Sequence, residues 1–295
     1  MSSLSSHIFD VSQFDKQECD FLGGLCAWEL SNFWKGKVGE VQAAITREGL
    51  NYKSMVTPSP KIAIARSATH VAATNSIPGN EYVADKAGED ANSYVYVIYN
   101  KRRENKEKVL KFNCGTRITF NKGNGEITYE GDFADEVKNM HELFLTHYTD
   151  DDLRLFIRAT IIESYGIKFR NSGAVYIIPK QGMDRLSKLD KILKEFTAGH
   201  IIMLGVPARS HEKGFILDSF ISDLESRIND IQHKIGKVNK RSSALKRQEK
   251  ALQECEKLSK IYADILEDEA KLDDLKTKMS EATNLIAKKM IEITS

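Results

Sequence analysis

The chain has 295 residues, which is long enough for one sizeable globular core together with an extension. Its 43 basic and 42 acidic side chains leave a net charge of +1, which excludes an overall electrostatic attraction to nucleic acid or membranes. Four scattered cysteines without a CxxC pair argue against a disulfide framework, and no segment approaches the about 18 apolar residues of a membrane helix. We therefore expect a cytoplasmic protein with reduced thiols, no signal peptide and no membrane partner.

The N-terminal part of the chain is predicted to be helical. Apolar residues such as Leu22, Leu25 and Trp28 recur near one helical face, and the pattern resumes from Val38 to Ile45. The sequence therefore predicts N-terminal helices over residues 10–50.

The apolar period changes to two between Asn51 and Gly131, which is typical of strands. The Asn- and Gly-rich run 121–125 favours a hairpin turn, and the polar run 76–92 is predicted to be a surface loop. Strands are expected at 61–66, 93–99, 108–112, 117–120 and 126–131.

Residues 132–210 are predicted to form an α+β unit with the order helix, hairpin, helix, strand. Thr149 or Asp150 is suited to cap the second helix of the region. If the strand at 126–131 joins the same sheet, the order approaches a split βαβ arrangement. The expected elements are helices over 132–147 and 150–165, a hairpin over 167–179, a helix over 183–196 and a strand over 200–207.

The last part of the chain carries a heptad repeat of apolar residues from about Gly214 to Ile293, with no proline. This repeat predicts a long helical coiled coil. Its apolar seam needs a partner helix from the same chain or from another copy, and self-association is the expected use. The predicted oligomerisation residues are Leu217, Ile221, Leu224, Ile228, Ile231, Ile235, Val238, Leu252, Ile265, Leu272 and Met279.

Charge is unevenly distributed along this repeat. Basic residues dominate 234–250, whereas acidic residues dominate 264–274. A parallel in-register dimer would place each block beside its own copy, so the pattern favours antiparallel packing centred near Leu252, in a dimer or in a hairpin within the chain. A bend at 239–243 has better turn residues but poorer charge matching.

Nucleic-acid binding is the main alternative. The helix and hairpin over 150–179 are similar to the end of a winged-helix pattern, although the aspartates at 150–152 would repel phosphates. The basic block of the repeat can contact a nucleic-acid backbone, although pairing with the acidic block is its simpler use. The predicted contact residues are Lys168, Arg170, Lys240, Arg241, Lys246 and Arg247.

The sequence carries no signature of catalysis. His141, His147 and the aspartates at 150–152 form the only cluster of candidate metal ligands, but carboxylates are also expected there at a helix start. No nucleophile elbow, reactive cysteine setting or phosphate-binding loop occurs. The sequence therefore predicts no catalytic residue, no metal site and no cofactor, and an enzyme of unrecognised class is the third hypothesis.

Residues 150–207 resemble a segment of uncharacterised phage and prophage proteins. In those proteins an amphipathic helix is followed by a hairpin with an R-x-S-G-x-V-Y-x-x-P-like motif. The resemblance covers a small part of the chain and implies an origin in a mobile element, without implying an activity. The matching residues are Arg170, Ser172, Gly173, Val175, Tyr176 and Pro179.

Together these patterns predict an α+β fold with a mixed or antiparallel sheet domain and N-terminal helices, followed by the C-terminal coiled coil. The expected domains are 1–131, 132–210 and 212–295. The expected function is a non-enzymatic assembly or partner-binding protein that associates with itself or with another protein through the coiled coil. The alternative is a nucleic-acid-binding factor of the phage type, for DNA maintenance or host takeover.

Overall fold

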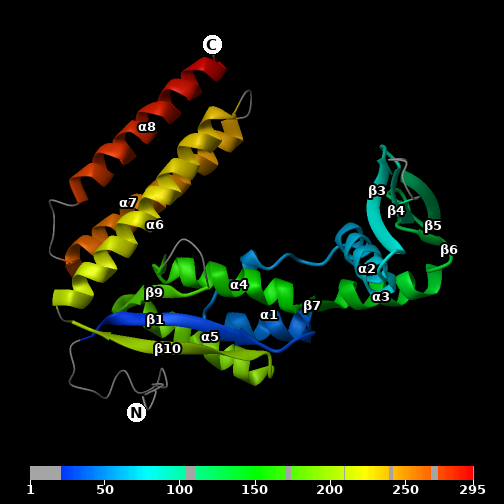
Figure 1. Cartoon of the computed structure of the whole chain (residues 1–295), viewed down its shortest axis with the longest axis horizontal. Coiled ribbons are helices and arrows are strands. Elements are labelled where there is room, and N and C mark those ends of the chain that lie inside the picture. The colour runs from blue at the N-terminus through cyan, green and yellow to red at the C-terminus, as the bar shows by residue number, and fades with distance from the viewer. Residues whose placement is uncertain are drawn as a thin grey trace. The chain divides into compact units, whose positions relative to one another are not determined.

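The chain is an α+β protein whose described strands form three antiparallel sheets. Packing divides it into two units, which we describe separately (Figure 1). Unit 1 comprises residues 1–31, 48–51 and 157–295, and unit 2 comprises residues 32–47 and 52–156. The computed structural model describes residues 21–103, 110–169, 174–208, 210–238, 242–266 and 272–294.

Unit 2 is built around a four-stranded antiparallel meander in the order β3-β4-β5-β6. Helices α2 and α3 pack on this sheet, where Ile64 and Val71 of α2 and Val137 of α3 share a core with Tyr94 and Ile98 of β4. A two-stranded sheet pairs β2 with β7. The elements are β2 (Lys35–Lys37), α1 (Val38–Arg47), the short 3-10 helix η2 (Tyr52–Ser54), α2 (Pro60–Asn75), β3 (Glu81–Glu89), β4 (Ser93–Arg103), β5 (Leu110–Asn121), β6 (Ile127–Gly131), α3 (Ala134–Thr146), β7 (His147–Thr149) and the start of α4 (Asp150–Glu163).

Helix α2 stands where the sequence predicts a strand at 61–66. The alternation of apolar residues in that run is short, and the residues before and after it favour a helix over a strand. Ser59 is the N-cap and accepts a hydrogen bond from the Ile62 amide at 3.4 Å, while Pro60 takes the first helical position. The apolar side chains then continue at helical spacing to Val71, which is fully buried.

Strand β3 lies within the polar run 76–92, which is predicted to be a loop. It pairs with β4 along its whole length except for one bulge. Because β3 is an edge strand of the sheet, it needs few apolar residues and its sequence is polar. The two strands predicted at 108–112 and 117–120 are parts of the single strand β5, with residues 108 and 109 outside the described residues.

His141 of α3 lies in unit 2 with only 5 % of its surface exposed. Its ring centroid lies 6.2 Å from that of Tyr129, and the side chain forms a hydrogen bond with the backbone of Pro60. Burial lowers the pKa of His141, and the Pro60 hydrogen bond and the charge of Glu142 only partly oppose this shift. The folded protein therefore favours the neutral imidazole.

Protonation of His141 should contribute to the pH dependence of the free energy of unfolding. In the unfolded chain His141 binds a proton more readily than in the folded chain, so the free energy of unfolding should fall as the pH drops below the ordinary histidine value of 6.5. His141→Gln should remove this part of the loss, measured by urea unfolding over a pH series, whereas His233→Gln at an exposed position should not. If His141→Gln and the unsubstituted protein lost the same free energy of unfolding at low pH, the loss would come from other titratable groups.

Unit 1 contains a four-stranded sheet in the order β10-β1-β9-β8. Helix α5 packs against β10, and the helices α6, α7 and α8 form a bundle that contacts β8 (Figure 1). Strand β6 belongs to the sheet of unit 2, so the predicted split βαβ arrangement is wrong. The elements are β1 (Phe21–Leu30), the end of α4, β8 (Ile167–Lys168), β9 (Tyr176–Pro179), the short 3-10 helix η3 (Lys180–Gly182), α5 (Met183–Glu195), β10 (Gly199–Pro207), α6 (Ser210–Gly236), α7 (Ser242–Leu266) and α8 (Asp273–Thr294).

Strand β1 overturns the prediction of N-terminal helices over 10–50, of which residues 10–20 lie outside the described residues. It is a central strand that pairs with β10 on one side and with β9 on the other. Cys26 is fully buried, and a strand covered on both faces has a continuous apolar sequence that periodicity does not distinguish from a helix. Gly23 permits close approach, because a Cβ there would lie 2.0 Å from the carbonyl oxygen of Ile178. Among the described residues of this region, only those of α1 form an α-helix.

The prediction of a long C-terminal coiled coil is wrong. The region forms three separate helices, α6, α7 and α8, which pack against one another and fold the apolar seam into a core within the chain. In Figure 1 the chain turns back after α6 and again after α7. A heptad pattern shows only that a helix has an apolar seam, and short antiparallel neighbours bury such a seam as well as a second copy does.

The predicted oligomerisation residues lie in or against this core. Ile221, Val238 and Ile265 are partly buried and pack against it. The other side chains are at most 6 % exposed, so the chain's own helices already cover them. These buried residues are Leu217, Leu224, Ile228, Ile231, Ile235, Leu252, Leu272 and Met279.

Tyr262 of α7 joins the bundle to the sheet of unit 1. Its ring stacks on Phe220 of α6 with centroids 4.6 Å apart. Its hydroxyl donates to the carbonyl of Tyr165 at 3.0 Å and to that of Ile177 at 3.3 Å. Burial raises the pKa of Tyr262, so the hydroxyl keeps its proton and remains a donor.

Candidate functional sites

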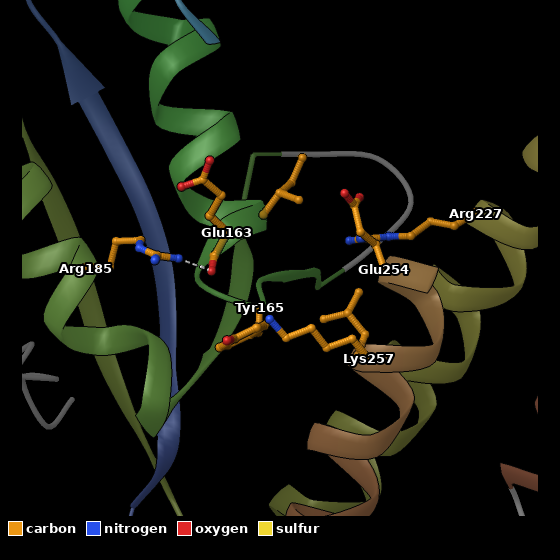
Figure 2. A pocket seen from close by; sticks show the side chains of 8 residues that line it. Glu163, Tyr165, Arg185, Arg227, Glu254 and Lys257 are labelled. Carbon is orange, nitrogen blue, oxygen red and sulfur yellow. Dashed lines mark hydrogen bonds between the residues drawn. The ribbon is translucent and has the colours of Figure 1, made fainter. Parts of the chain in front are cut away.

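A cleft in unit 1 lies where the end of α4 meets the C-terminal bundle (Figure 2). Its volume is about 250 Å³. This is slightly below the usual range of small-ligand pockets, whose lower limit is about 300 Å³. Five basic or acidic side chains and one tyrosine line it together with two apolar residues. The lining residues are Ile162, Glu163, Tyr165, Arg185, Arg227, Glu254, Lys257 and Leu258.

The turn between α4 and β8 forms one wall of this cleft. The last carbonyls of a helix have no partner within the helix. Here side chains from three other helices bind the carbonyl of Glu163, the last residue of α4, and two carbonyls of the turn that follows. Arg185 of α5 donates to the carbonyl of Glu163, and Arg227 of α6 donates to that of Gly166 at 3.1 Å. Tyr262 of α7 binds the carbonyl of Tyr165, which takes the left-handed conformation with φ of 62°. The turn is therefore fixed from three sides.

Three positively charged side chains face this wall. Arg227 also forms an ion pair with Asp223 at 2.7 Å, in which the arginine side chain is 26 % exposed and the aspartate 6 %. The Lys257 ammonium lies 4.9 Å from the ring centroid of Tyr165. Figure 2 shows Arg185 reaching the turn from α5, opposite Arg227 and Lys257 on the bundle. The arrangement is suited to binding a small anion.

A second basic surface lies at the junction of α6 and α7. We call it the basic end and define it by Lys237, Lys246, Arg247 and Lys250. All four side chains are exposed, and none forms an ion pair with another described residue. Lys246 and Lys250 are separated by one helical turn, and Arg247 lies beside them on α7. Within residues 234–250 the chain has seven basic residues and Glu249 as the single acidic one.

The basic end contains two of the residues predicted to contact nucleic acid, Lys246 and Arg247. Arg170, Lys240 and Arg241 lie outside the described residues. Lys168 is exposed on β8, beside Phe169, whose carbonyl accepts a hydrogen bond from Ser219 near the start of α6. From Ser219 to the end of α6 the helix runs about 25 Å at 1.5 Å per residue, so Lys168 is not part of the basic end.

The structure reverses the predicted charge matching of the repeat. Helix α6 packs against α7, and the basic residues at the end of α6 and in the first turns of α7 border the junction of the two helices. The acidic residues Asp264, Asp273 and Asp274 border the connection between α7 and α8 instead. Burial of the apolar seam therefore outweighs the attraction between the blocks, which is weak for exposed charges.

One protein-family model, described as a family of unknown function (DUF6744), matches residues 21–294. The chain belongs to this family. The match extends over both units, including the cleft and the basic end, so both surfaces fall within the family segment. No curated protein and no solved structure matches the chain.

In this DUF6744 chain, the histidines and aspartates considered as metal ligands are not brought together. His141 is buried, the ring of His147 lies beside Thr146, and Asp150 forms an ion pair with Arg154 at 3.6 Å. Among the described residues no group of three His, Cys, Asp or Glu side chains could hold a metal ion. In the same part of the chain, no helix is long and apolar enough to cross a membrane.

Asp152 has a structural role at the start of α4. Its carboxylate accepts hydrogen bonds from the Thr149 amide at 3.0 Å and from Arg66 at 2.6 and 2.8 Å. The capping expected at this helix start is therefore made by Asp152 together with Thr149. An open groove of about 420 Å³ lies beside this pair in unit 2, lined by α2, the end of α3 and the first residues of α4.

Sequence reasoning missed the cleft residues Arg185, Arg227 and Lys257. Each lies on a different helix, and each stands in an ordinary amphipathic pattern in which a basic residue indicates only an exposed face. No local motif marks them, because only the docking of the bundle on β8 and β9 brings them to the same turn.

Proposed function

We propose that this protein binds nucleic acid through the basic end of α6 and α7. The observation that carries the proposal is the packing of α6 against α7, whose junction is bordered by exposed basic residues that form no ion pair with a described acidic side chain. A nucleic-acid backbone presents closely spaced negative charges, and binding releases its condensed counterions. A surface of clustered Lys and Arg on adjacent helical turns is suited to this interaction.

Two further observations support a nucleic-acid partner. The apolar seam is buried within the chain, so it is not available as the self-association surface that its pattern indicates. The resemblance of residues 150–207 to phage and prophage proteins agrees with a role in the upkeep of a mobile element. The proposal concerns binding to the phosphate backbone and assigns no base-specific contact.

The test compares two variants with the same change in net charge. Lys246→Glu/Lys250→Glu alters the basic end, and Lys138→Glu/Lys191→Glu alters exposed lysines on α3 and α5. Binding of short single- and double-stranded DNA and RNA is measured by fluorescence anisotropy between about 50 and 200 mM salt. The first variant should bind about tenfold more weakly or worse, and its slope of log K against log salt should be shallower by about 1.8.

The second variant should keep the affinity of the unsubstituted protein to within about threefold, because its lysines are not part of the basic end. No binding to any of these nucleic acids at the lowest salt would overturn the proposal. Equal losses in the two variants would also overturn it, because they would show a response to net charge alone.

A further inference from the structure

The cleft of unit 1 holds guanidinium groups that are fixed in position and still have unused donors. Arg227 forms an ion pair with Asp223 and donates a hydrogen bond to the Gly166 carbonyl, and both contacts are made through Nη2. Arg185 contacts the Glu163 carbonyl through Nη1. Each guanidinium has five N–H donors, so most of them have no partner among the described residues.

Lys257 adds a third positive charge at the mouth of the cleft. Its side chain extends from α7 toward Tyr165 (Figure 2), and its ammonium group lies over the ring of that tyrosine, which holds the charge beside the turn without neutralising it. The acidic residues of the lining, Glu163 and Glu254, form no ion pair with these three basic residues in the described part of the chain. The three charges therefore surround the cleft as unpaired or partly paired donors.

We propose that this cleft binds the phosphoryl group of a ligand. Arg185 and Arg227 would donate hydrogen bonds to its oxygens, and the ammonium group of Lys257 would supply further positive charge to balance the negative charge of the phosphoryl group. A phosphoryl group has three oxygens and close to two negative charges, which suits fork-shaped donors held on opposite sides of a small cleft. Because the contacts with Glu163, Gly166 and Asp223 already hold both arginines, little side-chain freedom is lost when the ligand binds.

A purely structural role for the same residues gives a different result. Arg185 and Arg227 bind carbonyls at the end of α4, and this alone stabilises the turn. Lys257 binds no carbonyl in the described part of the chain, so it is the residue whose loss should affect a ligand more than the fold. The matched control is Lys260, which is exposed on the same helix and does not line the cleft.

The experiment titrates inorganic phosphate and pyrophosphate into the full chain by isothermal calorimetry, with thermal unfolding as a second readout. Saturable binding that raises the unfolding midpoint is expected. Lys257→Gln should raise the dissociation constant about tenfold, whereas Lys260→Gln should leave it nearly unchanged. Without ligand the two variants should unfold within about 3 °C of each other, because Lys257→Gln removes only the exposed contact with the Tyr165 ring. Absence of saturable binding, or equal effects of the two substitutions, would overturn the proposal.

Two sources of the phosphoryl group are distinguished by a second comparison. Oligonucleotides with a 5′-phosphate or a 5′-hydroxyl are titrated into the Lys246→Glu/Lys250→Glu variant, in which the basic end is altered. A preference for the 5′-phosphate that Lys257→Gln removes would assign the cleft to a nucleic-acid terminus, and binding of free phosphate without this preference would assign it to a small ligand. The cleft can pass this test even if the basic end binds no nucleic acid.

Discussion

Replacing Phe220 by alanine should lower the free energy of unfolding of unit 1 by about 3–5 kcal/mol. Phe220 is fully buried between α6 and α7, where its ring stacks on Tyr262. Alanine would leave a cavity at the point where the bundle joins the sheet. The two tryptophans of the chain lie in different units, so urea unfolding followed by Trp28 fluorescence in a Trp34→Phe background measures unit 1 alone.

The matched control is Phe215→Ala, five residues earlier on the same helix. Phe215 is 42 % exposed and contacts Phe169 at a centroid distance of 4.7 Å, so its loss should cost about 1 kcal/mol or less. Phe220→Leu, which keeps most of the apolar volume, should fall between the two and keeps the comparison usable if Phe220→Ala does not fold. Equal losses at positions 215 and 220 would contradict the burial of Phe220.

Asp152→Ala should destabilise unit 2 by about 3–5 kcal/mol, because removing one partner of a buried ion pair leaves the other unpaired. The Asp152 side chain is fully buried, and that of Arg66 is 24 % exposed. The substitution also removes the acceptor for the Thr149 amide at the start of α4. The measurement is urea unfolding followed by Trp34 fluorescence in a Trp28→Phe background.

Asp151→Ala is the control for this prediction, because the Asp151 side chain is 86 % exposed and one residue away. Its effect should stay within about 0.5 kcal/mol. In the double variant Arg66→Ala/Asp152→Ala the loss should be smaller than the sum of the two single losses, because no unpaired partner remains. Additive losses would show that the two side chains act independently.

The elements that the sequence locates correctly are those with local boundary signals. Helix α5 (Met183–Glu195) and the hairpin of β8 and β9 agree with their predicted positions, since glycines mark their ends in the sequence. The predictions are wrong where the secondary structure depends on packing against residues that are distant in the sequence. Strand β1 has a helix-like apolar sequence because both faces of its sheet are covered, and α6 has a coiled-coil seam because α7 and α8 cover it.

The residues of the candidate sites also differ in whether the local sequence indicates them or only tertiary packing brings them together. Lys246 and Arg247 are recognisable in the sequence because basic residues dominate 234–250, but their exposure and their position at the junction of α6 and α7 depend on the packing of these helices. Arg185 and Arg227 lie on different helices, α5 and α6, and strand β10 lies between them along the chain. Their common contact with the turn after α4 follows from tertiary packing, which no residue spacing indicates.

The position of β1 in the sheet has a consequence for synthesis of the chain on the ribosome. Leu25 pairs with Leu204, and the whole of unit 2 is made between these two residues. Translation proceeds at about 5–20 residues per second, so about 10–40 s pass between the synthesis of β1 and that of its partner strand β10. Unit 2 can complete its own meander in this interval, while β1 has unsatisfied backbone groups and apolar side chains. A nascent chain stalled before β10 is complete would therefore be a substrate for chaperones that bind extended apolar segments.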